Sequence, residues 1–290
     1  MNSPVLHRGL CVDASDSSNS SQADKARSFF GNECPLQPGP NELPTLDVGR
    51  NTQGCQYRDF SQPDTSSGMD ILALYKEKRP SIVQLKMDGH KDKGGQSIPE
   101  NWGGTAFMVA KEANSCLAIT DNHVVNGVPN VNGIPDKRTA VINTGESFDA
   151  KVIATDKSQD LALIEIATGD KTAAICKPLE IVDNKMDQAN VPAVAIGQAY
   201  TSGGFFVAEG TFDGMKKRGD AKPAPAPLPG EDADRDVQVL TMHVRPGVSG
   251  APAFEKDGKV AGVIDMGGGL GFAISTPITK QTIIDLKAKK

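Results

Sequence analysis

The sequence lacks the features that mark several large classes of protein. No apolar run reaches the ~18 residues that a membrane-spanning helix needs, and the first thirty residues hold no apolar segment of the kind found in signal peptides. The net charge is only −5, without a long block of like charge, so nothing points to a nucleic-acid partner or an anionic membrane. Motifs for zinc, for nucleotide phosphates and for dinucleotides are missing too, so we expect neither a metal nor a cofactor.

Cysteine is also scarce, and its five copies are widely scattered. The odd number means that not all of them can pair within the chain. Cys11, Cys34 and Cys55 fall in an irregular region and could bridge one another in an oxidising compartment. Cys116 lies in an apolar segment, where a small core residue is the expected role. The pairing therefore stays open.

Residues 1–68 differ in composition from the rest of the 290-residue chain. Serine, aspartate and asparagine fill most of Asp13 to Gln22, and proline and glycine are dense between Pro35 and Pro44. Such a stretch can bury little apolar surface, so we predict a disordered or loosely structured extension. A pro-segment and a partner-binding arm are both compatible with it.

From Met69 onward the pattern indicates an all-β domain that runs to residue 288. A short helical stripe begins at Ile71 and ends before Pro80, and a second helix is expected over Pro277–Ala288, with Thr276 as its cap. Between them, short apolar or alternating segments separated by turn residues predict an antiparallel architecture. The insertion from Lys216 to Asp236 has no period and is predicted to be a long mobile surface loop. The expected strands are Ser81–Met87, Thr105–Ala110, Cys116–Thr120, Thr139–Asn143, Phe148–Thr155, Leu161–Ile166, Val191–Ile196, Phe205–Phe212, Val237–Val244, Ala251–Phe254, Lys259–Asp265 and Gly271–Ile274.

Two of these strands place chemically useful side chains at their ends. The strand that begins at Cys116 delivers His123 at its edge, where an imidazole can work as a general base on a fixed backbone. Asp160 opens the strand Leu161–Ile166, and a carboxylate there could accept the second ring N–H of the histidine. Asp156, four residues earlier, competes for that role.

A third segment, Gly247-Val248-Ser249-Gly250-Ala251-Pro252, supplies a nucleophile. Glycines on both sides of Ser249 let the backbone turn sharply and approach a substrate carbonyl. The N–H groups of Gly247 and Ser249 could then form an oxyanion hole. The alternative is a Pro-Gly turn that carries an idle serine.

Together the three segments resemble the chymotrypsin-like serine proteases, in which histidine, aspartate and serine follow in this order. The finer resemblance, over about residues 69–288, is to the HtrA/Deg branch. It implies two perpendicular six-stranded β-barrels, about 80–170 and 178–276, with a short N-terminal and a C-terminal helix. It also implies a cleft between the barrels that holds a triad of His123, Asp160 and Ser249. Polypeptides would be the substrates, and the location would be extracytoplasmic, although no signal peptide is readable.

The chain also departs from that branch. It reaches Lys290 without a PDZ domain, so we expect a protease domain without PDZ regulation. Val248 and Ala251 stand where asparagine and glycine are usual. These changes keep a second hypothesis open, in which the protease fold is catalytically inactive and serves for binding. The oligomeric state is left open as well.

The resemblance also suggests where a specificity pocket would lie, around His243, Val244, Asp265 and Gly267. His243 near the pocket floor would favour an acidic or polar side chain before the scissile bond. A histidine packed under the barrel is the alternative that we weigh more heavily. The pocket has no trypsin-like aspartate, so cleavage after lysine or arginine is not expected.

Overall fold

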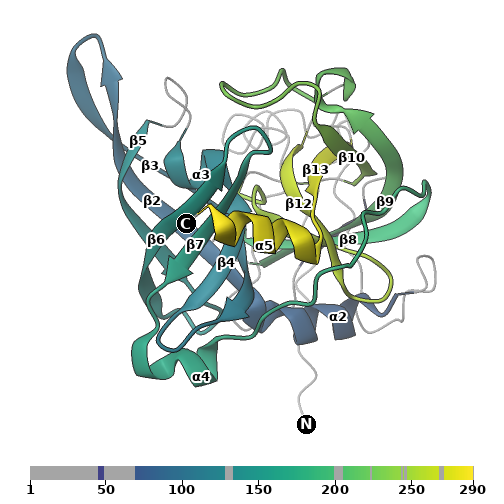
Figure 1. Ribbon diagram of the computed structural model, residues 1–290, viewed down its shortest axis with the longest axis horizontal. Coiled ribbons are helices and arrows are strands. Elements are labelled where there is room, and N and C mark those ends of the chain that lie inside the picture. The colour runs from purple at the N-terminus through teal and green to yellow at the C-terminus, as the bar shows by residue number, and fades with distance from the viewer. Residues whose placement is uncertain are drawn as a thin grey trace, which may run out of the picture.

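The computed structural model describes residues 45–48, 69–127, 133–198, 205–222, 224–242, 244, 247–267 and 271–289 (Figure 1). Two β-barrels lie side by side, with helix α2 (Ile71–Lys78) below them and helix α5 (Lys280–Ala288) across the front. This confirms the predicted all-β class with two six-stranded antiparallel barrels and a helix near each end of the domain.

The first barrel closes in the order β2-β3-β4-β7-β6-β5. Every neighbouring pair is antiparallel, and side chains that alternate along each strand fill the interior with aliphatic groups such as Leu85, Met108 and Ile164. Its strands are β2 (Ile82–Lys93), β3 (Gln96–Lys111), β4 (Cys116–Asp121), β5 (Ile134–Val141), β6 (Ser147–Asp156) and β7 (Leu161–Ile166).

The second barrel has the order β9-β10-β13-β12-β11-β8 and closes through the pairing of β8 with β9. Its strands are β8 (Val191–Gln198), β9 (Phe205–Lys217), β10 (Asp236–Thr241), β11 (Ala251–Phe254), β12 (Val260–Gly267) and β13 (Ala273–Pro277). A further strand, β1 (Thr45–Val48), pairs in parallel with β9. It is the only part of residues 1–68 that the structure describes, so the predicted loose extension otherwise lies outside the described residues.

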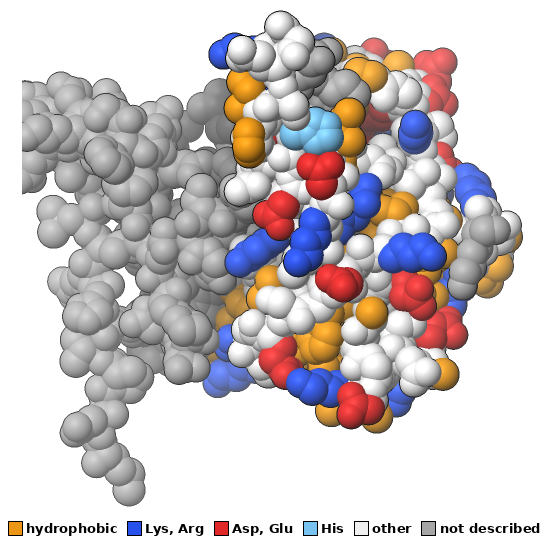
Figure 2. Space-filling model, turned by 90° about the vertical axis from the view of Figure 1, so that its left-hand side faces the viewer, with side chains coloured by type: hydrophobic (Ala, Val, Ile, Leu, Met, Phe, Trp, Pro, Cys, Tyr) orange, Lys and Arg blue, Asp and Glu red, His pale blue; other side chains and the backbone are white. Residues whose placement is uncertain are grey.

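The longest strands extend further than the sequence pattern predicts. β2 and β3 run twelve and sixteen residues and turn at Gly94 and Gly95, both at positive φ. Beyond Met87 both faces of this hairpin meet water, so the apolar alternation that identifies a half-buried strand disappears. Positive and negative side chains are interspersed over the outer face of the first barrel (Figure 2).

The C-terminal helix begins later than predicted. Pro277 is the last residue of β13 and pairs with Gly262, and the backbone N–H of Thr276 is bonded to the buried Asp265, so neither can open a helix. Thr279 is the N-cap instead, in a capping box with Thr282.

The segment predicted to be a long mobile surface loop, Lys216–Asp236, has many exposed residues but also contains regular structure and buried charges. Its first two residues complete β9, and Arg218–Asp220 form a 3₁₀ turn. Further along, the Asp232 N–H donates to the Ser158 carbonyl of the first barrel, and Arg235 pairs with Asp265 of the second. The Arg218 side chain is 1% exposed and bonds to Glu231 and to the carbonyls of Pro225 and Ala226. Polar, proline-rich composition predicted a loop without revealing that the charged side chains of Arg218, Glu231 and Arg235 are buried.

The structure contains a disulfide that the sequence did not predict. Cys116 is fully buried, as predicted, but it forms a disulfide with Cys176, with a Cα–Cα distance of 5.6 Å. The bridge ties β4 to the connection between the barrels. Cys11, Cys34 and Cys55 lie outside the described residues. In the part of the chain that the structure describes, no helix is long and apolar enough to cross a membrane.

Candidate active site

His123 sits in a one-turn helix, α3 (Asn122–Asn126), that follows directly on the buried strand β4. The indole of Trp102 donates to the carbonyl of Val124 at 2.8 Å, and Arg138 donates to that of Val125 at 2.7 Å. These bonds occupy carbonyl groups that a short helix leaves without partners. The backbone that presents the imidazole is therefore firmly placed.

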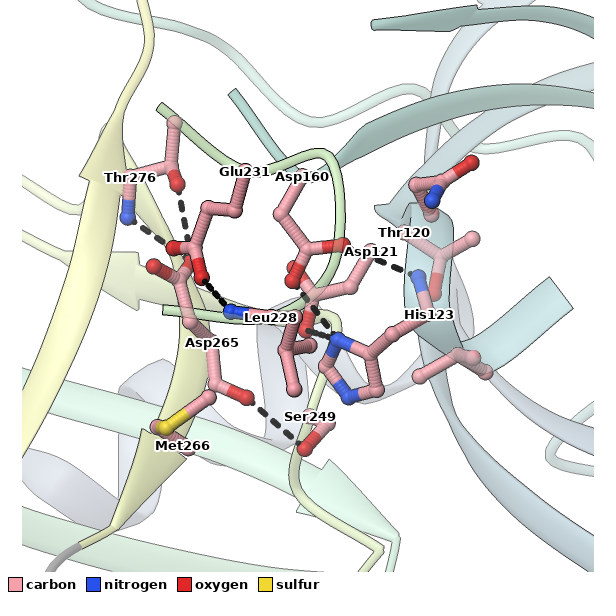
Figure 3. Close-up of polar contacts among 12 residues, drawn as sticks. Thr120, Asp121, His123, Asp160, Leu228, Glu231, Ser249, Asp265, Met266 and Thr276 are labelled. Atoms are coloured by element: carbon pink, nitrogen blue, oxygen red, sulfur yellow. Dashed lines mark hydrogen bonds and ion pairs between the residues drawn. The ribbon is translucent and has the colours of Figure 1, made fainter. Parts of the chain in front are cut away.

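Asp160 makes two contacts with His123 from the turn between β6 and β7 (Figure 3). Its carboxylate accepts from the backbone N–H of His123 at 2.9 Å and lies 2.7 Å from Nδ1 of the ring. The Asp160 carbonyl accepts from the N–H of Asn122 at 2.9 Å, and its φ is 54°. Asp156, the competing candidate, instead contacts Ser158 and Lys289.

Ser249 lies in a tight turn that is anchored to the first barrel. The Thr105 hydroxyl donates to the Gly247 carbonyl at 2.8 Å, and the Thr105 N–H donates to the Ser249 carbonyl at 2.8 Å. Gly247 and Gly250 both have positive φ, 96° and 85°, as the sequence pattern anticipates. Contacts across the two barrels thus place this turn beside the end of β4.

The hydroxyl of Ser249 points to β12 in this structure. It donates to the Asp265 carbonyl at 2.9 Å (Figure 3), and among the described residues no hydrogen bond joins it to His123. A rotation about one side-chain torsion would release it, since χ1 of serine has three staggered wells.

The residues expected in a specificity pocket are only partly described. His243 lies outside the described residues, Val244 is half-buried, and Gly267 ends β12. The Asp265 side chain is fully buried, where it pairs with Arg235 at 2.8 Å and accepts from Thr276. That carboxylate is therefore turned into the protein interior.

Asp121, which the sequence analysis did not single out, adds another buried acid beside the histidine. It is fully buried, and within the described residues neither of its carboxylate oxygens has a hydrogen-bond partner. Burial raises the pKa of Asp121 well above its ordinary value, and the nearby Asp160 and Asp265 raise it further. The sequence signal for Asp121 was its place as a polar residue at the end of a strand whose other positions are nearly all apolar.

The pKa of His123 is raised as well, although burial acts on a histidine in the opposite direction from its effect on Asp121. Burial is the largest single effect and lowers the pKa of His123, but the charge and hydrogen bond of Asp160, together with the charges of Asp265 and Glu231, outweigh it, so the pKa of His123 is raised. For Asp265, burial dominates over the opposing charge of Arg235 and raises the pKa to about 6. The site therefore favours an imidazolium next to Asp160.

Asp121, His123 and Asp160 also bring three atoms that can ligate metals within 4.8 Å of one another. The Nδ1 atom of His123 is already engaged with Asp160, the arrangement in which a carboxylate orients a general base. We interpret the group as a histidine–carboxylate pair with a buried neighbouring acid.

Comparison with known proteins identifies the same architecture. Residues 104–263, more than half of the chain, match the profile of the family described as "Trypsin-like peptidase domain". The serine protease Do-like HtrA of Bacillus subtilis is 25% identical over 242 residues, which cover 79% of this chain and 51% of that protein. The periplasmic pH-dependent serine endoprotease DegQ of Escherichia coli is 25% identical and is covered to 48%. The chain thus spans about half the length of these curated relatives.

Among solved structures, the active form of the Rv3671c protease from M. tuberculosis superposes with a TM-score of 0.54 at 19% identity. The match covers 88% of this chain and 93% of that one. The inactive form of the same protease gives a TM-score of 0.54 and covers 79% of this chain. At this identity the likeness concerns the fold.

Proposed function

Because the chain belongs to the trypsin-like peptidase family, we propose that it is a serine endopeptidase in which His123, Asp160 and Ser249 form the catalytic triad. The observation that carries the proposal is the double contact of Asp160 with His123, to the backbone N–H and to Nδ1. An aspartate that holds both the backbone and the ring of one histidine fixes the tautomer whose Nε2 can accept a proton.

In the proposed reaction the Ser249 hydroxyl turns from the Asp265 carbonyl toward the imidazole and attacks the scissile carbonyl carbon. His123 accepts the hydroxyl proton and then donates it to the leaving amine, which leaves an acyl-enzyme on Ser249. Water, activated by the same imidazole, hydrolyses the ester. The N–H groups of Gly247 and Ser249 would stabilise the oxyanion of each tetrahedral intermediate.

The substrates that we propose are polypeptides. His243, Val244, Asp265 and Gly267 remain our candidates for the walls of the specificity pocket, with Asp265 contributing its backbone because its carboxylate is engaged with Arg235. The relatives include a protein named as a periplasmic endoprotease, so we propose an extracytoplasmic location for this chain. The Cys116–Cys176 disulfide supports that location, since such bonds persist in oxidising compartments.

Labelling with a fluorophosphonate probe tests the proposal without knowledge of the substrate. The probe reacts with an activated serine, so we expect it to modify Ser249, and peptide mapping identifies the site. Ser249→Ala should abolish labelling, and His123→Ala and Asp160→Asn should each slow it by about 10³-fold or more. Asp156→Asn is the matched control, because it removes the aspartate that competed with Asp160 in the sequence but contacts Ser158 and Lys289 instead of His123, and it should label like the wild type. An unlabelled, folded wild-type protein would refute the proposed activity.

One observation favours a second candidate function, a catalytically inactive fold that binds polypeptides. The Ser249 hydroxyl is hydrogen-bonded to the Asp265 carbonyl in the structure and not to His123. In this case the wild type would stay unlabelled and still bind an unfolded polypeptide such as casein. The same affinity in Ser249→Ala would then show that the hydroxyl has no role.

A further inference from the structure

The segment between β9 and β10 lies directly against the loop that carries Asp160. The Asp232 N–H donates to the carbonyl of Ser158 at 3.0 Å, two residues before Asp160. A small pocket beside the histidine joins the two parts of the chain. Its walls are Asn122, His123, Gly127, Lys157, Asp160, Leu228, Pro229 and Glu231.

A chain of buried ion pairs runs from this segment into the second barrel, and Figure 3 shows its two carboxylates, Glu231 and Asp265. One carboxylate oxygen of Glu231 accepts from Arg218 at 2.7 Å and from Arg235. The other oxygen accepts from the Leu228 N–H at 2.7 Å. Arg235 continues to Asp265 at 2.8 Å. The side chains of these two arginines and two carboxylates are at most 1% exposed. Burial without such partners would be very unfavourable for each charge.

The network reaches the residues that support Asp160 and Ser249 of the proposed triad. Arg235 donates to the Thr276 hydroxyl at 2.6 Å, and that hydroxyl lies 3.1 Å from the carbonyl of Gln159, the residue before Asp160. Asp265 receives Arg235 on its carboxylate, while its carbonyl holds the Ser249 hydroxyl. Residues of the segment thus contact the supports of both Asp160 and Ser249.

We propose that residues 218–235 are a built-in part of the catalytic centre, in which Glu231 and Arg235 act as positioning residues for His123 and Asp160. The inference rests on the proposed function. It assigns a catalytic role to a segment whose composition resembles an ordinary surface loop.

Both acidic and basic side chains surround His123, and their charges act together on the imidazole. Four elements of the structure face the histidine with charged groups, namely Asp121, Asp160, Asp265, Glu231 and Arg235, with Arg218 behind Glu231 and Lys157 at the pocket. The raised pKa of Asp121 favours its neutral form, and the other three carboxylates face the two buried guanidinium groups. The remaining negative charge can balance one imidazolium, the species that forms as Ser249 loses its proton. The segment supplies one of those acids and both arginines.

The charge of Glu231 can be removed with little change in shape by Glu231→Gln. Because Glu231 favours the imidazolium, its loss should lower the pKa of His123. Neutral imidazole would then persist to lower pH, and the acid limb of the labelling rate should move to lower pH by about half a unit, which is about threefold in rate on that limb. The plateau rate should also fall, because the imidazolium formed in the reaction is less stabilised.

A charge-balanced variant separates electrostatics from packing. Arg218→Gln/Glu231→Gln removes one charge of each sign, so the acid limb should return close to its wild-type position. Asp236→Asn is the matched control: it loses the same charge just beyond the segment, at the start of β10, where its partner Lys217 is about half exposed and water screens the pair. This control should leave the profile unchanged.

The experiment combines two readouts on the full chain. The rate of fluorophosphonate labelling is followed from about pH 5 to 9, and the His123 ring is titrated by NMR, with His123→Ala to assign its signal among the four histidines. Folding of each variant is checked by circular dichroism. If Glu231→Gln fails to fold, the pKa of His123 is measured in two other variants. It should stay close to the wild-type value in the charge-balanced variant and should be lowered in Asp265→Asn.

The outcomes distinguish the two hypotheses. A lower pKa of His123 in Glu231→Gln that is reversed in the double variant supports the inference. An unchanged pKa of His123 in folded Glu231→Gln overturns it, even when the wild type labels normally. A wild type that never labels refutes the proposed protease activity, and the shift of the acid limb then has no catalytic meaning, so the positioning role falls with it.

Discussion

At the scale of single residues, the site is unusual in the number of acids that it buries. Asp121 and Asp265 lie behind the His123–Asp160 pair without exposure to solvent. Asp265 pairs with Arg235 at 2.8 Å, whereas Asp121 accepts no hydrogen bond from the described residues and lies 3.9 Å from Nδ1 of His123. Burial of a carboxylate without hydrogen bonds disfavours its charged form. Asp121 should therefore lower the stability of the folded state at neutral pH.

The variant Asp121→Asn tests this cost. The pKa of Asp121 is raised in the folded state, so the native protein binds its proton more tightly than the unfolded chain does. Stability from this group is present at low pH and is lost as pH rises from the unfolded pKa of about 3.9 toward the folded one. We therefore expect Asp121→Asn to be more stable than the wild type at pH 7, by a margin that shrinks toward about pH 4.

The measurement is the urea midpoint at a series of pH values, with Asp88→Asn as control because Asp88 is exposed. The control should follow the wild type throughout. A loss of stability in Asp121→Asn at neutral pH would show that the carboxylate has a partner that offsets its burial.

At the scale of elements, the nucleophile turn depends on the absence of a side chain at Gly250. Its φ is +85°, and a Cβ there would lie 2.0 Å from the Thr105 carbonyl oxygen and 2.3 Å from the Thr120 hydroxyl. Gly145 has a similar φ of +89° but nothing within 4 Å. The two glycines thus separate backbone strain from steric overlap.

We expect Gly145→Ala to cost about 1–2 kcal/mol, the cost of a left-handed backbone with a side chain. Gly250→Ala adds overlap with a neighbouring strand, worth about 1–3 kcal/mol more, and should also abolish labelling of Ser249 because the turn must move. Chemical denaturation and probe labelling measure the two effects. Equal losses in the two variants would mean that β3 can yield to the added methyl group.

The predictability of each element follows from how much apolar pattern it carries. All twelve barrel strands were predicted because each has an interior face, such as that of Leu161–Ile166. The outer half of the β2–β3 hairpin has no such face, and its length was missed. His123, Asp160 and Ser249 could be found because they adjoin strands and glycines. Glu231 and Arg235 could not, since their burial depends on partners far away in the sequence.

At the scale of the whole molecule, one apolar cluster joins the two barrels with helices α2 and α5. It contains Phe107 and Leu163 from the first barrel, Val207 and Phe254 from the second, and Leu286 from α5. The C-terminal helix follows the last strand of the second barrel and packs against β6 and β7 of the first. Because the proposed triad draws residues from both barrels, this shared core also fixes the distance between them.

The shared core predicts that the barrels unfold together. Leu286 is 2% exposed, so Leu286→Ala should cost about 2–5 kcal/mol, whereas Ile284→Ala on the exposed side of the same helix should cost less than about 0.5 kcal/mol. Trp102, the only tryptophan, reports on the first barrel through its fluorescence, and circular dichroism reports on all strands. We expect Leu286→Ala to lower both midpoints equally. A fluorescence transition that stays at its wild-type position while the dichroism transition moves would show that the first barrel is stable without the packing of α5.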